Sequence, residues 1–257
     1  MKFIKRVLYQ IFGKRIYFRI ISIFFFTLYY SGLLKISKKF KIHYFVSKLI
    51  KKGDTIIDIG ANLGYYTKIF SGATGSEGIV WAVEPVPLYR EILKKNIAGT
   101  SNTVIIPYAL GDKDSMADMG IPGNQPYRHG LTRILKPGES EEVDTDFNVE
   151  IKEPSSLFGN LDKVDYIKCD IEGYEDHVIP GFMEIIRRDR PIIQIEVERG
   201  NRKLINDILT KEGYIPYMPV KKRLNQISEP EKYNDDIIYI HKKSKDKITE
   251  FINNHSI

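Results

Sequence analysis

The sequence predicts an α/β protein: a doubly wound, Rossmann-like and mostly parallel sheet of about seven strands with an antiparallel C-terminal hairpin, preceded by an N-terminal helical segment. Three observations predict it. Short aliphatic runs bounded by Gly or Asp recur from residue 52 onward, they are continuous rather than alternating, and amphipathic stretches separate them. Continuous aliphatic strands are typical of sheets that helices cover on both faces. A composition of 42% hydrophobic and 28% charged residues over 257 positions is that of a folded globular chain.

Residues 1–50 form a separate basic and aromatic segment, which we expect to be helical. Residues 1–52 hold 13 of the 39 Lys and Arg and no Asp or Glu, whereas the rest of the chain holds 26 basic and 33 acidic residues. The segment therefore differs in composition from residues 51–257, which we expect to form the main domain.

The uncharged run of residues 20–34 bears on membrane association. As a helix it would extend about 22 Å, short of the roughly 30 Å hydrocarbon core. Basic residues flank it on both sides, which favours a helix lying in the interface of an anionic membrane. A soluble cap over the main domain and a strained transmembrane span are the alternatives. No recognisable nucleic-acid-binding motif accompanies the basic residues, and we expect no nucleic-acid partner.

The main domain alternates strands and helices in a regular order. We expect strands at residues 55–59, 79–83, 103–106, 164–169 and 192–197, and helices at residues 65–71, 88–97 and 202–211. Residues 214–218 and 237–241 are expected to close the sheet as a hairpin. Residues 112–161 interrupt this alternation with an irregular insertion rich in Gly, Pro, Asp, Glu and Ser, with one plausible strand at residues 147–151. A loop of this length is usually functional, and we expect a substrate lid.

The turn after the first strand predicts a ligand site. Asp58 precedes Gly60, Asn62 and Gly64, and a helix follows directly. Glycines permit a tight turn and close approach to a ligand, and asparagine tolerates the left-handed region. A nicotinamide fingerprint would be G-x-G-x-x-G, whereas the spacing here is G-x-x-x-G. Asp58 suits a ligand with a cationic amino group better than a pyrophosphate.

Glu84 ends the second strand, 20 residues after Gly64. A carboxylate at this place accepts hydrogen bonds from the vicinal hydroxyls of a ribose in dinucleotide-binding folds. The residues therefore predict a ribose-bearing ligand without identifying it.

Five blocks carry a family resemblance in this order: DTIIDIGANLGYYT at 54–67, VEP at 83–85, ALGD at 109–112, VDYIKCDIEGYE at 164–175 and PIIQIE at 191–196. Over about residues 52–198 the chain resembles class I S-adenosylmethionine-dependent methyltransferases, and more closely the FkbM family. The resemblance implies that residues 51–257 form a methyltransferase domain. It also implies an S-adenosylmethionine site around Gly60, Asn62, Gly64 and Glu84, with Asp112 near the adenine. Acceptors in such families are typically hydroxyls of sugars, polyketides or glycolipids.

Acidic residues follow two neighbouring strands at the edge where open α/β sheets bind ligands. Asp170 and Glu172 come after the fourth strand, and Glu196 and Glu198 end the fifth. They predict either a general-base cluster or a hard-cation site, such as Mg²⁺ held by Asp170 and Glu196. Asp170 is the first candidate for base or metal ligand, and Glu172 or Glu196 the second. A helix N-cap at Asp170 with a dipole-favoured acid at Glu172 is the alternative.

His129 lies in the irregular insertion beside Arg128. A histidine titrates near neutrality, so it could act as a base if the insertion closes over the donor. A surface histidine without such a role is the alternative.

The expected function is therefore S-adenosylmethionine-dependent O-methylation of a sugar or glycolipid hydroxyl, at the inner face of the membrane in the cytoplasm. Cys169 is the only cysteine, which excludes an intrachain disulfide and indicates a reducing compartment. An NAD(P)-dependent oxidoreductase and a catalytically silent membrane-associated adaptor are the alternatives.

Overall fold

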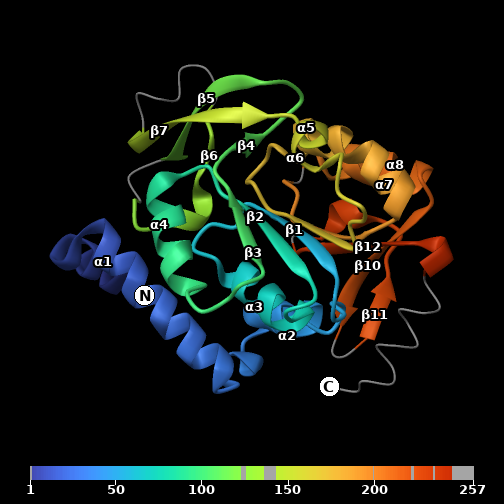
Figure 1. The fold of residues 1–257 in the computed structure, drawn as a ribbon. Coiled ribbons are helices and arrows are strands. Elements are labelled where there is room, and N and C mark those ends of the chain that lie inside the picture. The colour runs from blue at the N-terminus through green and yellow to red at the C-terminus, as the bar shows by residue number, and fades with distance from the viewer. Residues whose placement is uncertain are drawn as a thin grey trace.

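The computed structural model describes residues 2–122, 126–135, 143–198, 200–220, 223–233 and 235–244. Figure 1 shows a twisted main sheet with helices on both of its faces, a smaller sheet beside one of its ends, and a long helix along the outside.

The main sheet has eight strands in the order β11-β10-β12-β9-β8-β1-β2-β3. Their bounds are β1 Thr55–Ile59, β2 Ile79–Val83, β3 Thr103–Ile106, β8 Tyr166–Cys169, β9 Ile192–Ile195, β10 Tyr214–Val220, β11 Arg223–Gln226 and β12 Ile237–His241. The strand pairs β3–β2, β2–β1, β1–β8 and β8–β9 are parallel, whereas β12 is antiparallel to both β9 and β10. This arrangement confirms the predicted doubly wound sheet and its antiparallel end. The sequence did not predict β11, which pairs with β10.

Helices cover both faces of this sheet. They are α1 (Lys2–Tyr30), α2 (Lys41–Val46), α3 (Tyr65–Thr74), α4 (Pro87–Asn96), α5 (Pro154–Phe158), α6 (Glu175–Val178), α7 (Met183–Asp189) and α8 (Arg202–Lys211). Successive residues of β1 point to opposite faces. Ile57 packs in the cluster that includes α5 to α8, and Ile56 packs in the cluster that includes α2 and α3. Burial on both faces explains why the strands are continuously aliphatic.

Most of the described part of the insertion forms a second sheet, so the prediction of an irregular segment at residues 112–161 was wrong there. Its four strands have the order β4-β7-β5-β6, with β4 Ala109–Leu110, β5 Ser115–Pro122, β6 Arg133–Ile134 and β7 Val143–Lys152. The one strand expected in the insertion, at residues 147–151, is confirmed as part of β7, and residues 123–125 and 136–142 lie outside the described residues. Strand β5 runs antiparallel to β7 along most of its length. Met119, Val149 and Ile151 form the buried side of this sheet with Ala109. The apolar residues alternate with Asp, Asn, Glu and Gly, and this half-buried pattern resembles a polar loop in sequence.

The N-terminal segment is helical and packs on the main domain. Helix α1 is kinked at Gly13, which has φ 70° and ψ 168°. Its inner side chains Tyr17 and Phe18 are buried with Tyr89 of α4, and Phe25 and Phe26 are buried with Ile69 of α3. Two short 3-10 turns and α2 then lead to β1. No helix in the described ranges combines the length and the apolar character needed to cross a membrane.

Candidate active site

A pocket lies at the carboxyl ends of β1, β2 and β8, where the second sheet covers the first. It encloses about 670 Å³, including the part open to solvent. The first sheet and its loops contribute Gly60, Asn62, Glu84, Asp170 and Glu172 to the lining. The second sheet and its connections contribute Ala109, Leu110, Met119, Gly130, Thr132 and Ile134.

The turn after β1 brings two backbones into contact at the base of the pocket. Gly60 has φ 76°, and a Cβ added to it would lie 1.9 Å from the carbonyl oxygen of Asp170. Asn62 also adopts a positive φ, at 51°. Only glycine fits at residue 60, because the loop after β8 leaves no room for a side chain. The pattern that predicted a ligand-binding turn therefore also reflects this close approach of two loops.

Two backbone amides hold the Glu84 carboxylate at the turn after β1. Its Oε2 accepts a hydrogen bond from the Asn62 amide at 2.7 Å, and its Oε1 accepts one from the Val86 amide at 2.8 Å. The side chain is 4% exposed but lines the pocket. Burial raises the pKa of Glu84 to about 7, although both amide bonds favour the ionised form. Each carboxylate oxygen has a further lone pair with which to accept a hydroxyl from the pocket.

A set of hydrogen bonds, which we call the clasp, joins the segment between β5 and β6 to the turn after β1. The Asn62 side-chain Nδ2 donates to the backbone oxygen of His129 at 3.1 Å, and His129 Nδ1 lies 2.6 Å from Asn62 Oδ1. Because that oxygen can only accept, His129 carries its proton on Nδ1. The Thr132 hydroxyl donates to the same backbone oxygen at 2.9 Å and lies 2.7 Å from the Tyr89 hydroxyl.

The clasp holds His129 as a neutral imidazole. Burial lowers the pKa of His129 to about 3, and its ring packs edge-on against Phe18 of α1 at 5.3 Å between centroids. Gly130 lines the pocket, but His129 itself does not. The geometry thus favours a positioning role for His129 over proton transfer.

A buried lysine lies between two carboxylates behind the pocket. Lys168 of β8 places Nζ 3.2 Å from Asp170 Oδ2 and 3.8 Å from Asp58 Oδ1. The Thr67 hydroxyl donates to the other oxygen of Asp58 at 2.6 Å. Burial alone would lower the pKa of Lys168, but the Asp170 and Asp58 charges outweigh it and raise the pKa. Lys168 is therefore a fixed ammonium that neutralises this part of the site.

Glu172 projects from the loop after β8 with a positive φ of 56° and lines the pocket. A left-handed glutamate is strained, and such strain concentrates at functional sites. Burial, followed by the charge of Asp170, raises the pKa of Glu172 to about 7. Glu175 accepts bonds from the amides of Ile171 and Gly173 and so holds this loop in place.

The predicted site residues fall into two groups. Five line the pocket: Gly60, Asn62, Glu84, Asp170 and Glu172. The others lie outside its lining: Asp58, Gly64, Asp112, His129 and Glu196. Gly64 shapes the turn with φ 83°, and Asp112 is exposed beside His177.

The structure does not support the predicted Mg²⁺ site at Asp170 and Glu196. Across the described residues, no three His, Cys, Asp or Glu side chains gather in an arrangement that could hold a metal ion. The cation beside Asp170 is the ammonium of Lys168.

Sequence reasoning missed several residues that contribute to the site. Lys168 could have been noticed, because a lysine inside a buried aliphatic strand demands a charge partner. Met119, Thr132 and Ile134 could not, because they reach the pocket only through the pairing of the second sheet.

The chain was compared with known families and proteins. The family model of the methyltransferase FkbM domain matches residues 58–216. A protein-L-isoaspartate O-methyltransferase 1 of Archaeoglobus fulgidus is 32% identical over 59 residues, which are 22% of this chain and 27% of that protein. The corresponding enzyme of Aeropyrum pernix is 28% identical over 75 residues, 29% of this chain and 27% of the enzyme. The chain thus spans about a quarter of the length of these relatives.

Two solved structures have similar folds. A methyltransferase FkbM from Methylobacillus flagellatus superposes with a TM-score of 0.47 and 17% identity, covering 75% of this chain and 44% of that chain. A SAM-dependent O-methyltransferase from Thermotoga maritima superposes with a TM-score of 0.45 and 16% identity, covering 77% and 63%.

Proposed function

The chain belongs to the FkbM methyltransferase family, as the match over residues 58–216 shows, and on this premise we propose that it transfers a methyl group from S-adenosylmethionine to a hydroxyl oxygen of a sugar or glycolipid. The match favours methyl transfer over the oxidoreductase and adaptor alternatives. The observation that carries the hydroxyl assignment is the ionisable Glu172, which lines the same pocket as Gly60, Asn62 and Glu84, the residues expected to hold the donor.

The residues present fit S-adenosylmethionine as the donor. Gly60 and Asn62 of the turn line the pocket, and the Glu84 carboxylate lines it with lone pairs left for the ribose hydroxyls. Leu110, Met119 and Ile134 add an apolar wall. When bound, the donor supplies an electrophilic methyl group on a sulfonium.

Glu172 is the group best placed to accept the acceptor's proton. An alcohol is a weak nucleophile until its proton is removed, and a carboxylate with a pKa near 7 is suited to this task at neutral pH. Asp170 was the first candidate in the sequence, but its Oδ2 accepts a hydrogen bond from Lys168. We therefore assign proton acceptance to Glu172 and a supporting role to Asp170. With the donor bound, Glu172 would hold the proton that the acceptor hydroxyl releases as its oxygen takes the methyl group from the sulfonium.

The charge of the pocket supports a hydroxyl acceptor over a carboxyl one. A substrate carboxylate would lie against Glu172, and the charge of the ionised Glu172 would oppose its binding, whereas Asp170 is already paired with Lys168. Sugars present neutral hydroxyls that can donate to such carboxylates. The acceptor chemistry thus differs from that named for the isoaspartate methyltransferase relatives.

The test supplies the full chain with methyl-labelled donor and three acceptor sets: monosaccharides and glycolipid extracts, primary amines, and free carboxylic acids. The bond to the labelled methyl is identified by NMR and mass spectrometry. A methyl ether on a sugar supports the proposal. Label transferred only to nitrogen or to a carboxylate would overturn the acceptor assignment.

A further inference from the structure

We propose that the outer face of α1 docks on an anionic lipid bilayer, with its exposed apolar side chains at the headgroup boundary and basic residues on both sides. This inference goes beyond the proposed methyl transfer and does not depend on which acceptor is used. It rests on two independent features of the described residues, apolar exposure and charge.

The second half of α1 has an unpartnered apolar face. Beyond the kink at Gly13, Ile16, Ile20, Ile23 and Phe24 are 54%, 38%, 51% and 63% exposed. Their spacing of three or four residues places them on one side of the helix.

Exposed apolar side chains are concentrated in this segment. Among the described residues, nine of the fourteen large exposed hydrophobic side chains lie between residues 11 and 36. Scattered exposed apolar residues need no explanation, but a contiguous set marks an interaction surface.

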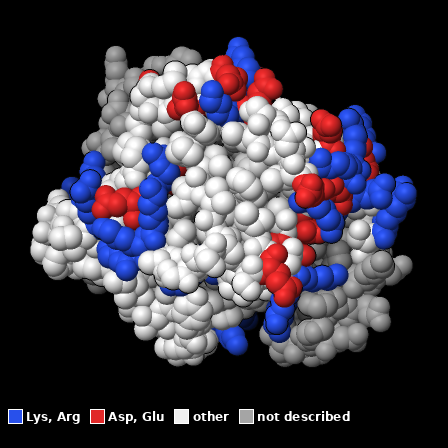
Figure 2. Space-filling view, viewed as in Figure 1, with Lys and Arg blue, Asp and Glu red and all other residues white. Residues whose placement is uncertain are grey.

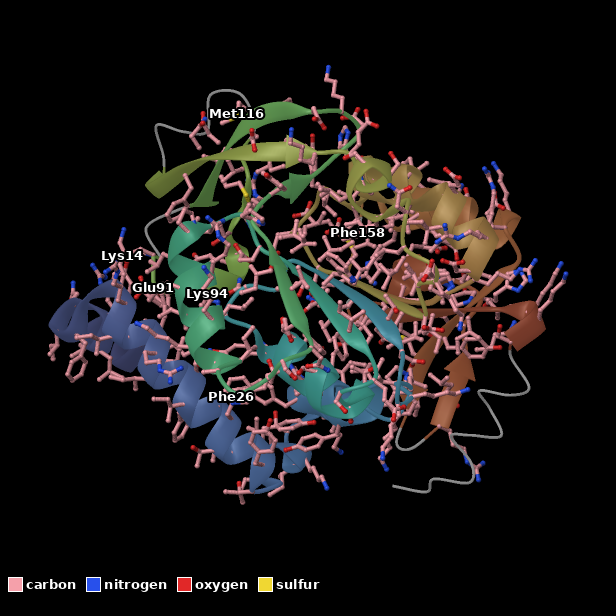
Figure 3. The ribbon with its side chains drawn as sticks, viewed as in Figure 1. Lys14, Phe26, Glu91, Lys94, Met116 and Phe158 are labelled. Carbon is pink, nitrogen blue, oxygen red and sulfur yellow. The ribbon has the colours of Figure 1, made fainter. Side chains whose placement is uncertain are left out.

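The opposite face of α1 is already used in packing. Tyr17 and Phe18 are 1% exposed, and Phe25 and Phe26 are 7% exposed. Figure 3 shows Phe26 on the side of α1 that faces α3. The inner side chains therefore hold α1 on the domain, while the outer apolar face has no partner in the described chain.

The charges that the structure describes around this face are basic except for Glu91 of α4, which forms an ion pair with Arg15 at 3.2 Å. Lys14 and Arg15 precede it, and Lys35, Lys38 and Lys39 follow it, all with exposed side chains. Residues 1–52 contain no Asp or Glu. Figure 2 shows mostly uncharged surface over the lower part of α1, and Lys and Arg side chains around a small acidic patch where α1 meets α4.

An anionic bilayer fits both features better than a second copy or a nucleic acid. Two copies meeting through this face would bring two all-basic segments together, and like charges oppose that contact. A nucleic acid would meet the basic residues but leave the isoleucines in water. Amphipathic helices that lie on membranes combine an apolar face with lysine and arginine at its edges.

Docking would orient the pocket relative to the bilayer. Phe18 on the inner side of α1 packs against the His129 ring, and His129 is bound to Asn62 in the ligand-binding turn. Helix α1 therefore contacts a residue that is bonded to the turn at the pocket. A bilayer on the outer face of α1 would hold the site at a fixed place above the membrane.

The experiment is vesicle cosedimentation of the full chain, using phosphatidylcholine alone and phosphatidylcholine mixed with phosphatidylglycerol. The wild type is expected to bind the mixed vesicles and to remain in solution with the neutral ones. Ile20→Ser/Ile23→Ser/Phe24→Ser should lower the partition coefficient at least about tenfold. Lys38→Ala/Lys39→Ala should lower it about fivefold for each charge removed.

The control replaces exposed apolar residues outside α1: Met116→Ser/Leu204→Ser/Val220→Ser should bind as the wild type does. Figure 3 shows Met116 on the second sheet, away from α1. Circular dichroism and donor affinity verify that each variant is folded. A wild type that stays in solution with both vesicles, or a triple α1 variant that binds undiminished, would overturn the proposal. Sedimentation showing a wild-type dimer that the α1 variant dissociates would assign the face to a second copy instead.

Discussion

Gly60 is the residue on which the shape of the pocket base depends. Its positive φ and the nearby Asp170 carbonyl both exclude a side chain. Gly53 offers a matched comparison, because its φ of 85° is similar but nothing lies within 4 Å of an added Cβ. Gly53→Ala should cost only the left-handed conformation, about 1 kcal/mol, whereas Gly60→Ala should cost at least about 2 kcal/mol more through the collision. Urea unfolding measures the loss of stability in both variants. Equal losses would mean that the loop after β8 moves to make room for the added methyl group.

Glu172 predicts the pH dependence of the reaction. A base acts in its ionised form, so kcat at saturating donor should rise through pH about 7 and level off above it. Asp170→Asn removes a charge that raises this pKa, and the rising limb should therefore move to lower pH.

Glu172→Gln should lower kcat at least about 100-fold with donor affinity unchanged. Glu184→Gln on the exposed side of α7 should behave as the wild type. A Glu172→Gln variant that keeps both the rate and the pH profile would remove this residue from proton transfer.

At the scale of single residues, the sequence predicted the pocket residues that belong to a local motif. Gly60, Asn62 and Glu84 line the pocket because each follows a strand end whose position can be read from the aliphatic pattern. Lys168 stands out in an aliphatic strand, but its pairing with Asp170 could not be predicted in the same way. Burying the ammonium costs free energy that the ion pair offsets, and both amounts depend on how completely β8 is buried.

Among the elements, strands with continuous aliphatic runs were predicted accurately and the second sheet was not. The expected and observed bounds agree for β1, β2, β3 and β12. By contrast, β5 and β7 pair across a long separation and contain Gly, Pro and Asp, so local composition indicated a loop. The physical reason is that their stability comes from packing at Met119 and Val149, which appears only after the strands have paired.

The clasp between the second sheet and the turn after β1 leads to a prediction at the same scale. Thr132→Val removes the hydroxyl that bonds both Tyr89 and the His129 backbone oxygen. The His129 oxygen keeps its hydrogen bond from the Asn62 side chain, but the buried Tyr89 hydroxyl loses this partner, which should destabilise the fold by about 1–3 kcal/mol. Thr132→Ser keeps the hydroxyl and should retain most of the stability. Chemical unfolding compares the two, and equal losses would show that the methyl group, not the hydroxyl, matters at this position.

In the whole molecule, α1 is part of the folded unit although its composition sets it apart. Phe18 is 1% exposed and Phe24 is 63% exposed on the same helix. Phe18→Ala should therefore reduce the free energy of unfolding by about 3–5 kcal/mol, and Phe24→Ala should change it by less than about 0.5 kcal/mol. A Phe18→Ala variant as stable as the wild type would mean that α1 does not pack on α4 in solution.

The overall topology followed from the sequence because the order of aliphatic strands and amphipathic helices leaves few arrangements of a parallel sheet. The placement of β12 between β9 and β10, and of the second sheet over the pocket, depends on long-range pairing. The sequence therefore predicted the half of the pocket that the first sheet builds and missed the half that covers it.

The central claim is that the pocket between the two sheets binds S-adenosylmethionine through Glu84, and calorimetric titration of the donor tests it most directly. The wild type should bind one donor per chain, and Glu84→Ala should weaken binding at least about 30-fold, corresponding to about 2 kcal/mol for the lost charged hydrogen bonds. Glu91→Ala, at a partly exposed residue of α4 that does not line the pocket, is the control and should bind normally. A folded Glu84→Ala variant with wild-type affinity, or a wild type that does not bind the donor, would contradict the account.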